Sequence, residues 1–289
     1  HANRGMAINA GTLECPQTFG STYSSVVMEV GHVHVEAGAT FVPYAKYRIT
    51  SVSGLTGSGT VNQSAAGNIW PLSISTAGGS VFAGKLTGNI RLTVGSTRQD
   101  FTGVESDFGY KSDGNVYVGT GADIGVQSFG LGATKNSLGS NYHSYYKYYC
   151  PVLFDGSGKL TYLGEGETSD RWFKFTSTVS AGIDGGAKGG LALTGKFFSS
   201  ANGQLVMTFG GDNENACSLN SAIVPASAAN SIYLAKAGPG TWIFYGNTNN
   251  VNGGVVGVEG GTLQFDKLTD AGQPSSFGLS NRLGTKYQG

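Results

Sequence analysis

Short runs in which bulky apolar residues alternate with polar ones recur along the chain, most clearly at 240–244 and 261–265. In Gly240-Thr241-Trp242-Ile243-Phe244, the large residues Trp242 and Phe244 occupy every second position. The phrase returns as Gly261-Thr262-Leu263-Gln264-Phe265, with its Thr 21 residues after the first. A period of two indicates strands with one buried face. Because the glycine- and asparagine-rich turn GNTNNVNGG separates the two runs, they predict one coil of a solenoid.

Comparable strand phrases extend this pattern over the rest of the chain, at intervals of about 20 to 30 residues. Examples lie at 33–42, 55–61, 90–94, 159–163 and 205–209. No segment has a convincing helical period with caps, and no linker divides the chain. We therefore expect a single all-β domain over residues 1–289, a parallel β-helix with projecting loops of unequal length. An antiparallel sandwich or jelly roll is the alternative, but Asn-Gly and Asp-Gly hairpin signals are few.

The composition narrows the classes of partner. Gly accounts for 48 of 289 residues, charged residues for only 12%, and the formal net charge is zero. A neutral chain offers no electrostatic reason to bind nucleic acid or an anionic membrane. No apolar run approaches the roughly 18 residues that a membrane span needs. A surface built from Thr, Ser, Asn and Gly favours an extracellular or cell-surface location.

The stretch GPGTWIFYGNTNNVNGGVVGVEGGTLQF at 238–265 resembles the bacterial autotransporter-associated β-strand repeat. Residues 35–61 look like another unit, and KLTYLGEGETSDRWF at 159–173 looks like a spacer phrase between units. The resemblance implies a right-handed parallel β-helix in a secreted or surface-exposed protein. It brings no shared catalytic residues. The three cysteines and a tyrosine-rich insert at 141–150 depart from the pattern.

The two ends of the chain suggest a mode of assembly. Residues 275–278 begin a unit that the last residues leave incomplete, and residues 2–8 align with 169–175, placing Arg4 opposite Arg171. The last residues of one copy and the first of the next would then share one coil, so that open strand edges pair head to tail into a homopolymer. The residues predicted to form this assembly interface are Asn3, Arg4, Met6, Ile8, Leu283 and Tyr287. The alternative is a fragment of a longer repeat protein.

The insert at 141–150 is the most unusual stretch, with five tyrosines in eight residues. Tyrosine-rich surfaces suit a protein interface or stacking on sugar rings, and packing against the solenoid flank is the alternative. The tyrosines predicted to contact a partner are Tyr142, Tyr145, Tyr146, Tyr148 and Tyr149. Cys150 could pair with Cys217 to hold the insert, although sequence does not fix the connectivity.

Candidate chemistry is sparse. Glu165, Glu167 and Asp170 beside Arg171 form the densest charge cluster, which could serve acid/base glycosidic cleavage but is better explained as an ion pair at a coil corner. Scattered aspartates and the pair His32 and His34 lack the spacing of a metal site. We therefore predict no catalytic residue, no metal and no cofactor. The expected function is a structural subunit of an extracellular filament or matrix, with a glycan-binding adhesin next and a polysaccharide-acting enzyme last.

Overall fold

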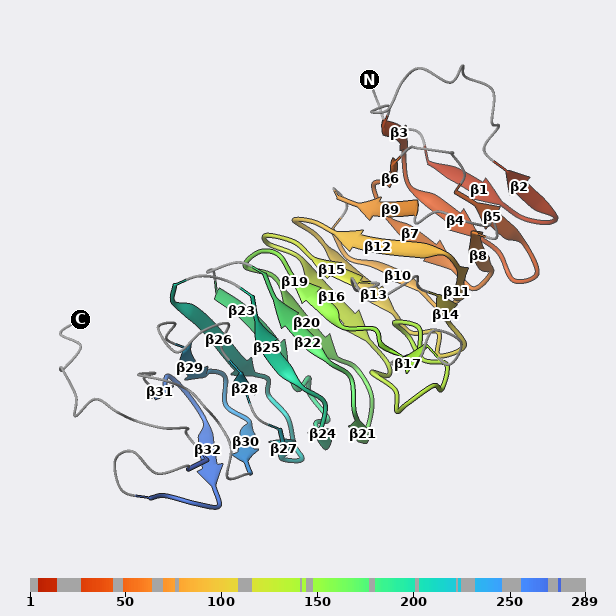
Figure 1. Ribbon diagram of the computed structural model, residues 1–289. Helices are drawn as coiled ribbons and strands as arrows, with labels where there is room; N and C mark the ends of the chain where they lie inside the picture. Colours follow the sequence, from red (N-terminus) through yellow and green to blue (C-terminus); the bar gives the residue numbers. More distant parts are fainter. Residues whose placement is uncertain are drawn as a thin grey trace.

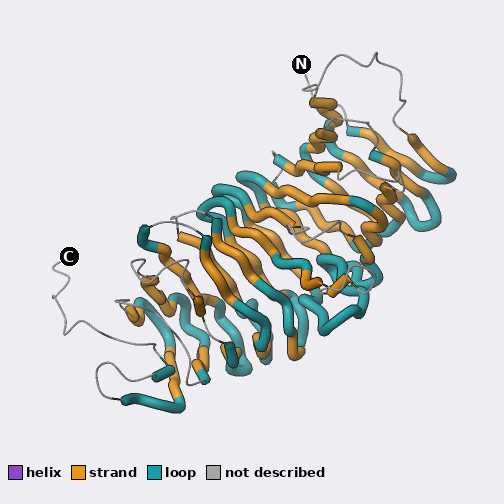
Figure 2. Tube along the Cα trace, in the orientation of Figure 1, coloured by secondary structure: helices purple, strands orange, loops and turns teal. Residues whose placement is uncertain are grey.

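The computed structural model describes residues 5–14, 27–43, 49–63, 70–75, 78–108, 116–140, 142–143, 148–176, 180–200, 203–221, 223–224, 232–245, 256–269 and 275–276. These residues contain strands and no helix. The chain is a right-handed parallel β-helix, an elongated stack of coils with the two termini at opposite ends (Figure 1). Loops join the strands at the corners of each coil (Figure 2).

Sheet A runs the whole length of the stack. Its strands are β1 (Met6–Ile8), β4 (Val33–Val35), β7 (Leu55–Gly57), β10 (Ser80–Phe82), β13 (Arg98–Phe101), β16 (Asp123–Val126), β20 (Lys159–Tyr162), β23 (Ser180–Asp184), β26 (Leu205–Gly210), β29 (Ile232–Lys236) and β31 (Val256–Val258). Sheet C holds β3 (Val27–Val30), β6 (Ile49–Val52), β9 (Trp70–Ile74), β12 (Ile90–Val94), β15 (Val116–Val118), β19 (Val152–Phe154), β22 (Phe173–Phe175), β25 (Phe197–Ser199) and β28 (Ile223–Val224).

Two shorter sheets and one hairpin complete the coils. Sheet B holds β2 (Thr12–Glu14), β5 (Thr40–Val42), β8 (Thr60–Gln63), β11 (Lys85–Gly88) and β14 (Asp107–Phe108). Sheet D, in the C-terminal half, holds β21 (Glu167–Ser169), β24 (Leu191–Leu193), β27 (Cys217–Leu219), β30 (Thr241–Phe244) and β32 (Thr262–Phe265). Between the ranges of sheets B and D lie residues 127–140 and the antiparallel hairpin β17 (Tyr142–His143) and β18 (Tyr148–Tyr149).

Register places like residues above one another. Phe154 of β19 pairs with Phe175 of β22, and their rings stack at 5.0 Å between centroids. The inward positions of the N-terminal half are mainly Val, Ile and Leu, whereas the C-terminal half stacks Phe197, Phe209 and Trp242. Because each strand presents alternate residues inward, a period-two sequence fills this core without any helix.

Glycine permits the close approach of successive coils at one corner. A Cβ on Gly84 would lie 2.0 Å from the carbonyl oxygen of Gly59, and a Cβ on Gly103 would lie 2.0 Å from that of Gly84. Backbone therefore packs on backbone along a column of three glycines.

One expectation about register is wrong. The alignment of residues 2–8 with 169–175 would place Met6 and Ile8 in the same sheet as Phe173 and Phe175. Instead, β1 is the first strand of sheet A, where Met6 pairs with Val33, and β22 belongs to sheet C. The aligned segments share an Arg and alternating apolar residues, and strands of every sheet alternate in this way, so similarity alone did not distinguish the faces.

Candidate functional site: the edges of the terminal coils

Among the described residues, the strands at each end of the stack are paired on one side only. Sheet A ends at β31 and sheet D at β32, and no described residue pairs with their outer edges. Their inward positions stay accessible: Val258 is 57% exposed, whereas its register partner Lys236 is 1% exposed. Leu263 is half-buried above Trp242, which is fully buried. The last coil thus offers accessible apolar side chains beside strand edges with which no described strand pairs.

The first coil is built in the same way. Met6 is half-buried beside the fully buried Val33, and Leu13 is half-buried beside the fully buried Phe41. Ile8, at 6% exposure, is nearly covered. Of the predicted interface residues, Met6 and Ile8 therefore lie on a terminal strand. Asn3, Arg4, Leu283 and Tyr287 lie outside the described residues.

The two terminal coils share one local design, displaced by 250 positions. In the first, β1 ends at Ile8, and Gly11 with φ of 72° opens the Thr-Leu-Glu strand β2. In the last, β31 ends at Val258, and Gly261 with φ of 67° opens the Thr-Leu-Gln-Phe strand β32. Positive φ favours glycine, so both corners need this residue for the same turn. A coil like 6–14 has the shape to stack on the coil 256–265.

The tyrosine insert forms the hairpin of β17 and β18, in which Tyr142 pairs with Tyr149 and His143 with Tyr148. The Tyr149 ring stacks on Trp172 with centroids 4.2 Å apart and planes 8° apart. Tyr149 therefore packs on the flank of the solenoid, which is the alternative to a partner contact that the sequence left open. The side chains of Tyr142 and Tyr148, and all of Tyr145 and Tyr146, lie outside what the structure describes.

Cys150 and Cys217 do not form a disulfide with each other. Both side chains are buried, Cys150 just before β19 and Cys217 on β27, three coils further along. Three coils at about 4.8 Å each amount to roughly 14 Å, whereas a disulfide needs Cα atoms within about 7 Å. The pairing suggested from sequence is therefore not made. Burial raises the pKa of the Cys217 thiol.

The charge cluster at 165–171 holds the segment 127–140 against the solenoid. Glu167 accepts a hydrogen bond from the Ser128 hydroxyl at 2.8 Å, and Asp170 accepts one from the Gly132 N–H at 2.8 Å. Arg171 is fully buried and donates hydrogen bonds to the Phe129 carbonyl, the Asn136 side-chain oxygen and the Gly139 carbonyl. Burial lowers the pKa of Arg171 to about 10, against the opposing influence of Cys150, Asp170 and Glu167. The guanidinium remains charged at neutral pH.

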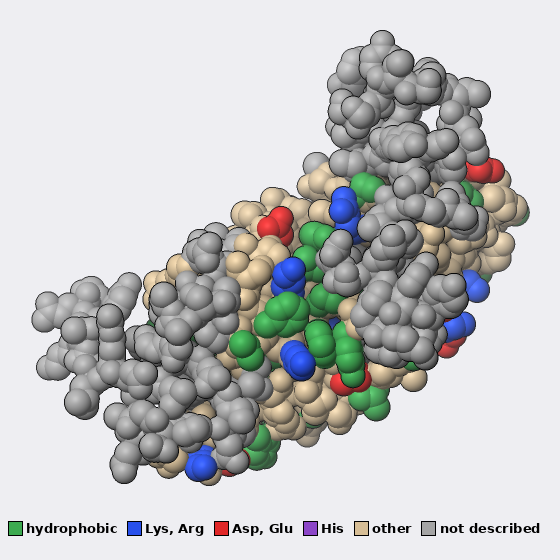
Figure 3. Space-filling model, viewed as in Figure 1, with side chains coloured by type: hydrophobic (Ala, Val, Ile, Leu, Met, Phe, Trp, Pro, Cys, Tyr) green, Lys and Arg blue, Asp and Glu red, His purple; other side chains and the backbone are tan. Residues whose placement is uncertain are grey.

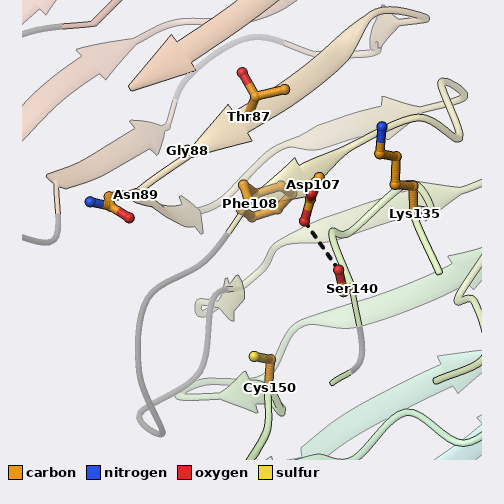
Figure 4. A pocket seen from close by; sticks show the side chains of 8 residues that line it. All are labelled: Thr87, Gly88, Asn89, Asp107, Phe108, Lys135, Ser140 and Cys150. Atoms are coloured by element: carbon orange, nitrogen blue, oxygen red, sulfur yellow. Dashed lines mark hydrogen bonds between the residues drawn. The ribbon is translucent and has the colours of Figure 1, made fainter. Parts of the chain in front are cut away.

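A pocket of about 410 Å³ lies beside this segment, where sheet B ends (Figure 4). Its lining residues are Thr87, Gly88, Asn89, Asp107, Phe108, Lys135, Ser140 and Cys150. The Asp107 carboxylate accepts a hydrogen bond from the Ser140 hydroxyl at 3.1 Å. These lining residues include one carboxylate, whereas acid/base cleavage of a glycosidic bond requires a pair. The described lining therefore defines no reaction.

Histidine and aspartate side chains are engaged in the solenoid wall. His32 and His34 both hydrogen-bond to the Thr56 hydroxyl, at 2.9 Å each. Asp123 forms an ion pair with Arg98 at 2.7 Å and another with Lys159 at 3.4 Å. In the described ranges, no group of three or more His, Cys, Asp or Glu could hold a metal ion. Nor does the described part of the chain contain a helix long and apolar enough to cross a membrane.

The chain is a parallel β-solenoid, and its first and last coils share the same turn and strand sequence pattern. No protein-family model matches the chain, and neither a curated protein nor a solved structure matches it. The resemblance to autotransporter-associated repeats remains a prediction.

Proposed function

We propose that the chain is a non-catalytic structural subunit that assembles head to tail into an extracellular filament or matrix. The observation that carries this proposal is the likeness of the two terminal coils. Stacking β1 of one copy on β31 of another would place Met6 over Val256 and Ile8 over Val258. Stacking β2 on β32 would place Leu13 over Leu263.

Such a junction would repeat the contacts that already join coils within the chain. Parallel strand addition supplies backbone hydrogen bonds, and the inward apolar residues supply burial. The interface is heterologous because one end meets the other, so it extends into a fibre unless rotation closes a ring. This model stacks whole coils, whereas the sequence-based model completed one coil from two chains.

Two further observations support the structural class. The carboxylates of Glu167 and Asp170 are used to hold a loop, which leaves them no evident catalytic task. The low charge content and the resemblance to autotransporter-associated repeats support placement outside the cell or on its surface. Glycan binding is the second candidate function, favoured by the stacking of Tyr149 on Trp172.

The proposal is tested by electron microscopy and light scattering of the purified chain at rising concentration. We expect fibres, with an axial repeat of about 53 Å for eleven strands of sheet A at about 4.8 Å each. Leu263→Lys should block growth, because it places a charge on the inward side of the last coil. The matched control is Leu131→Lys, since Leu131 is 51% exposed in the segment 127–140 and should leave assembly unchanged.

A mixture of two blocked variants sharpens the test. Leu13→Lys keeps the C-terminal edge intact, and Leu263→Lys keeps the N-terminal edge intact. Head-to-tail pairing predicts that each variant alone is monomeric and that the mixture forms a capped dimer. A wild-type chain that stays monomeric at every concentration, or a mixture that forms no dimer, refutes end-to-end stacking.

A further inference from the structure

The outer face of sheet C carries a row of rings and cations on neighbouring strands. One outward position of the register runs through Ser51, Ser73, Thr93, Tyr117, Leu153, Lys174, Phe198 and Val224. Leu153 is covered, at 4% exposure, so the accessible surface of this row lies on either side of it. Apolar side chains gather on this face with Lys and Arg among them (Figure 3). We call the outward surface formed by Arg91, Tyr117, Tyr149, Trp172, Lys174, Lys196 and Phe198 the sheet C strip. Half-buried rings and cations on the outside of a β-helix differ from the ion pairs and hydroxyls of sheet A, and this composition suits a partner.

The rings of the strip contact one another and the cations. The ammonium of Lys196 lies 4.6 Å from the centroid of the Trp172 ring. Tyr149 stacks on the same indole, and the Phe198 ring meets it edge-on with centroids 6.0 Å apart. The Arg91 guanidinium lies 5.2 Å from the centroid of Tyr117. These contacts order the long cationic side chains, which reduces the entropy that a ligand must remove.

The strip has a local positive charge on a neutral chain. Strands β6 to β28 of sheet C contain no Asp or Glu within their bounds. Ion pairs in the described residues lie elsewhere, for example Arg98 with Asp123 and Lys188 with Glu214. None of these ion pairs includes Arg91, Lys174 or Lys196. The cations are therefore available to an anionic ligand.

We propose that the sheet C strip binds an acidic polysaccharide whose chain lies along the axis of the β-helix. The half-buried rings of the strip offer apolar contact to sugar C–H groups, and Arg91, Lys174 and Lys196 pair with carboxylates spaced along the polymer. The hydroxyls of Ser51, Ser73 and Thr93 continue the same row and suit sugar hydroxyls. Strands repeat every ~4.8 Å, which gives an extended polymer contacts at regular intervals.

The charge density favours a sugar acid over nucleic acid. Proteins that hold a phosphate backbone neutralise it with many basic residues, and only three cations lie on this strip. Aromatic rings would also stack on unpaired bases. Single-stranded DNA is therefore the competitor to include in the test. The proposal does not depend on self-assembly.

The test measures binding of octagalacturonate by titration calorimetry at two salt concentrations, with a neutral oligosaccharide of equal length and (dT)8 as comparison ligands. We expect affinity for octagalacturonate to fall as salt rises. The double variant Lys174→Gln with Lys196→Gln should lose at least about tenfold in affinity, because two charge-assisted contacts are removed. Phe198→Ala should weaken binding several-fold without changing the net charge.

The matched control is Lys85→Gln with Lys188→Gln, which makes the same charge change at exposed positions off sheet C. We expect this control to bind within about twofold of the wild type, because exposed charges contribute little, even in an ion pair such as Lys188 with Glu214. An equal loss in the control, an equal affinity for the neutral oligosaccharide, tighter binding of (dT)8, or no binding of octagalacturonate would each overturn the proposal. The Leu263→Lys background separates the two hypotheses, since failure to assemble there should leave binding of the short oligomer intact.

Discussion

Replacing Arg171 tests whether this buried side chain holds the segment 127–140 against the solenoid. The side chain is fully buried and donates to three oxygens, those of Phe129, Asn136 and Gly139, while its Nη1 has no partner among the described residues. Arg171→Met keeps much of the volume and removes all three hydrogen bonds. The change in stability depends on two effects. Buried oxygens lose their hydrogen-bond donor, which destabilises the protein, and a buried charge is removed, which stabilises it.

The magnitude follows from these two opposing effects. The Asn136 oxygen still accepts from the Leu138 N–H at 2.9 Å, so the Phe129 and Gly139 carbonyls are the acceptors that lose their donor. Each costs about 1 to 3 kcal/mol, and the two together cost roughly 2 to 6 kcal/mol. Removing a buried, incompletely satisfied charge returns a few kcal/mol. We expect a net loss of about 2 kcal/mol in the free energy of unfolding, which for a chain of this size corresponds to roughly 4 °C in Tm.

The assay is thermal unfolding followed by circular dichroism, together with limited proteolysis of the native protein. Cleavage should appear within 127–140, because this segment loses its buried hydrogen bonds to Arg171 and keeps only those to Glu167 and Asp170, while sheets A and C stay paired. Asp170→Asn is the matched control, since its amide oxygen still accepts from the Gly132 N–H at the same place. An Arg171→Met variant as stable as the wild type, with an uncut loop, would show that the buried guanidinium does not hold the segment.

Two other predictions concern the solenoid itself. Gly84→Ala should destabilise the protein by about 3 kcal/mol, because its Cβ would meet the backbone oxygen of Gly59 and the coils must separate. The measurement is chemical denaturation, and an unchanged midpoint would contradict the packing argument. Burial raises the pKa of Tyr162 to about 12, so from about pH 10 upwards an unfolded tyrosine ionises while the folded one stays protonated. Stability should therefore fall between pH 10 and 12, and Tyr162→Phe should reduce this fall when each protein is compared with its own value at pH 8. An unaltered pH profile in Tyr162→Phe would count against a buried, protonated phenol.

The alternation of apolar residues predicted the fold because a parallel solenoid buries one face of every strand. Trp242 and Phe244 identified strand β30, and the second phrase identified β32 in register with it. These features are local, so a single sequence contains them.

The sites depended on contacts that local patterns do not encode. Leu153 and Phe198 share one outward row only because the coils have a particular length, and unequal loops hide that length in the sequence. Arg171 looked like half of an ion pair at a corner, yet its hydrogen bonds go to oxygens more than 30 positions earlier. The sequence shows the likeness of the terminal coils as two Gly-Thr-Leu phrases. The similarity of residues 2–8 to the internal spacer at 169–175 led to a different alignment.

Self-assembly and polysaccharide binding make a joint prediction. If coils stack with little rotation at each junction, the sheet C strips of successive copies lie on one side of the fibre, roughly 53 Å apart. A long polygalacturonate could then bridge several strips, and multivalency would raise its apparent affinity by about 10² to 10⁴ relative to the assembly-blocked Leu263→Lys chain. Octagalacturonate is too short to bridge two strips, so it should bind the fibre and the assembly-blocked chain equally. Binding to fibres would be measured by co-sedimentation, and binding to monomers by calorimetry. A gain of the same size for the short oligomer would mean that assembly changes the strip itself, and no gain for the long polymer would place successive strips on different sides of the fibre.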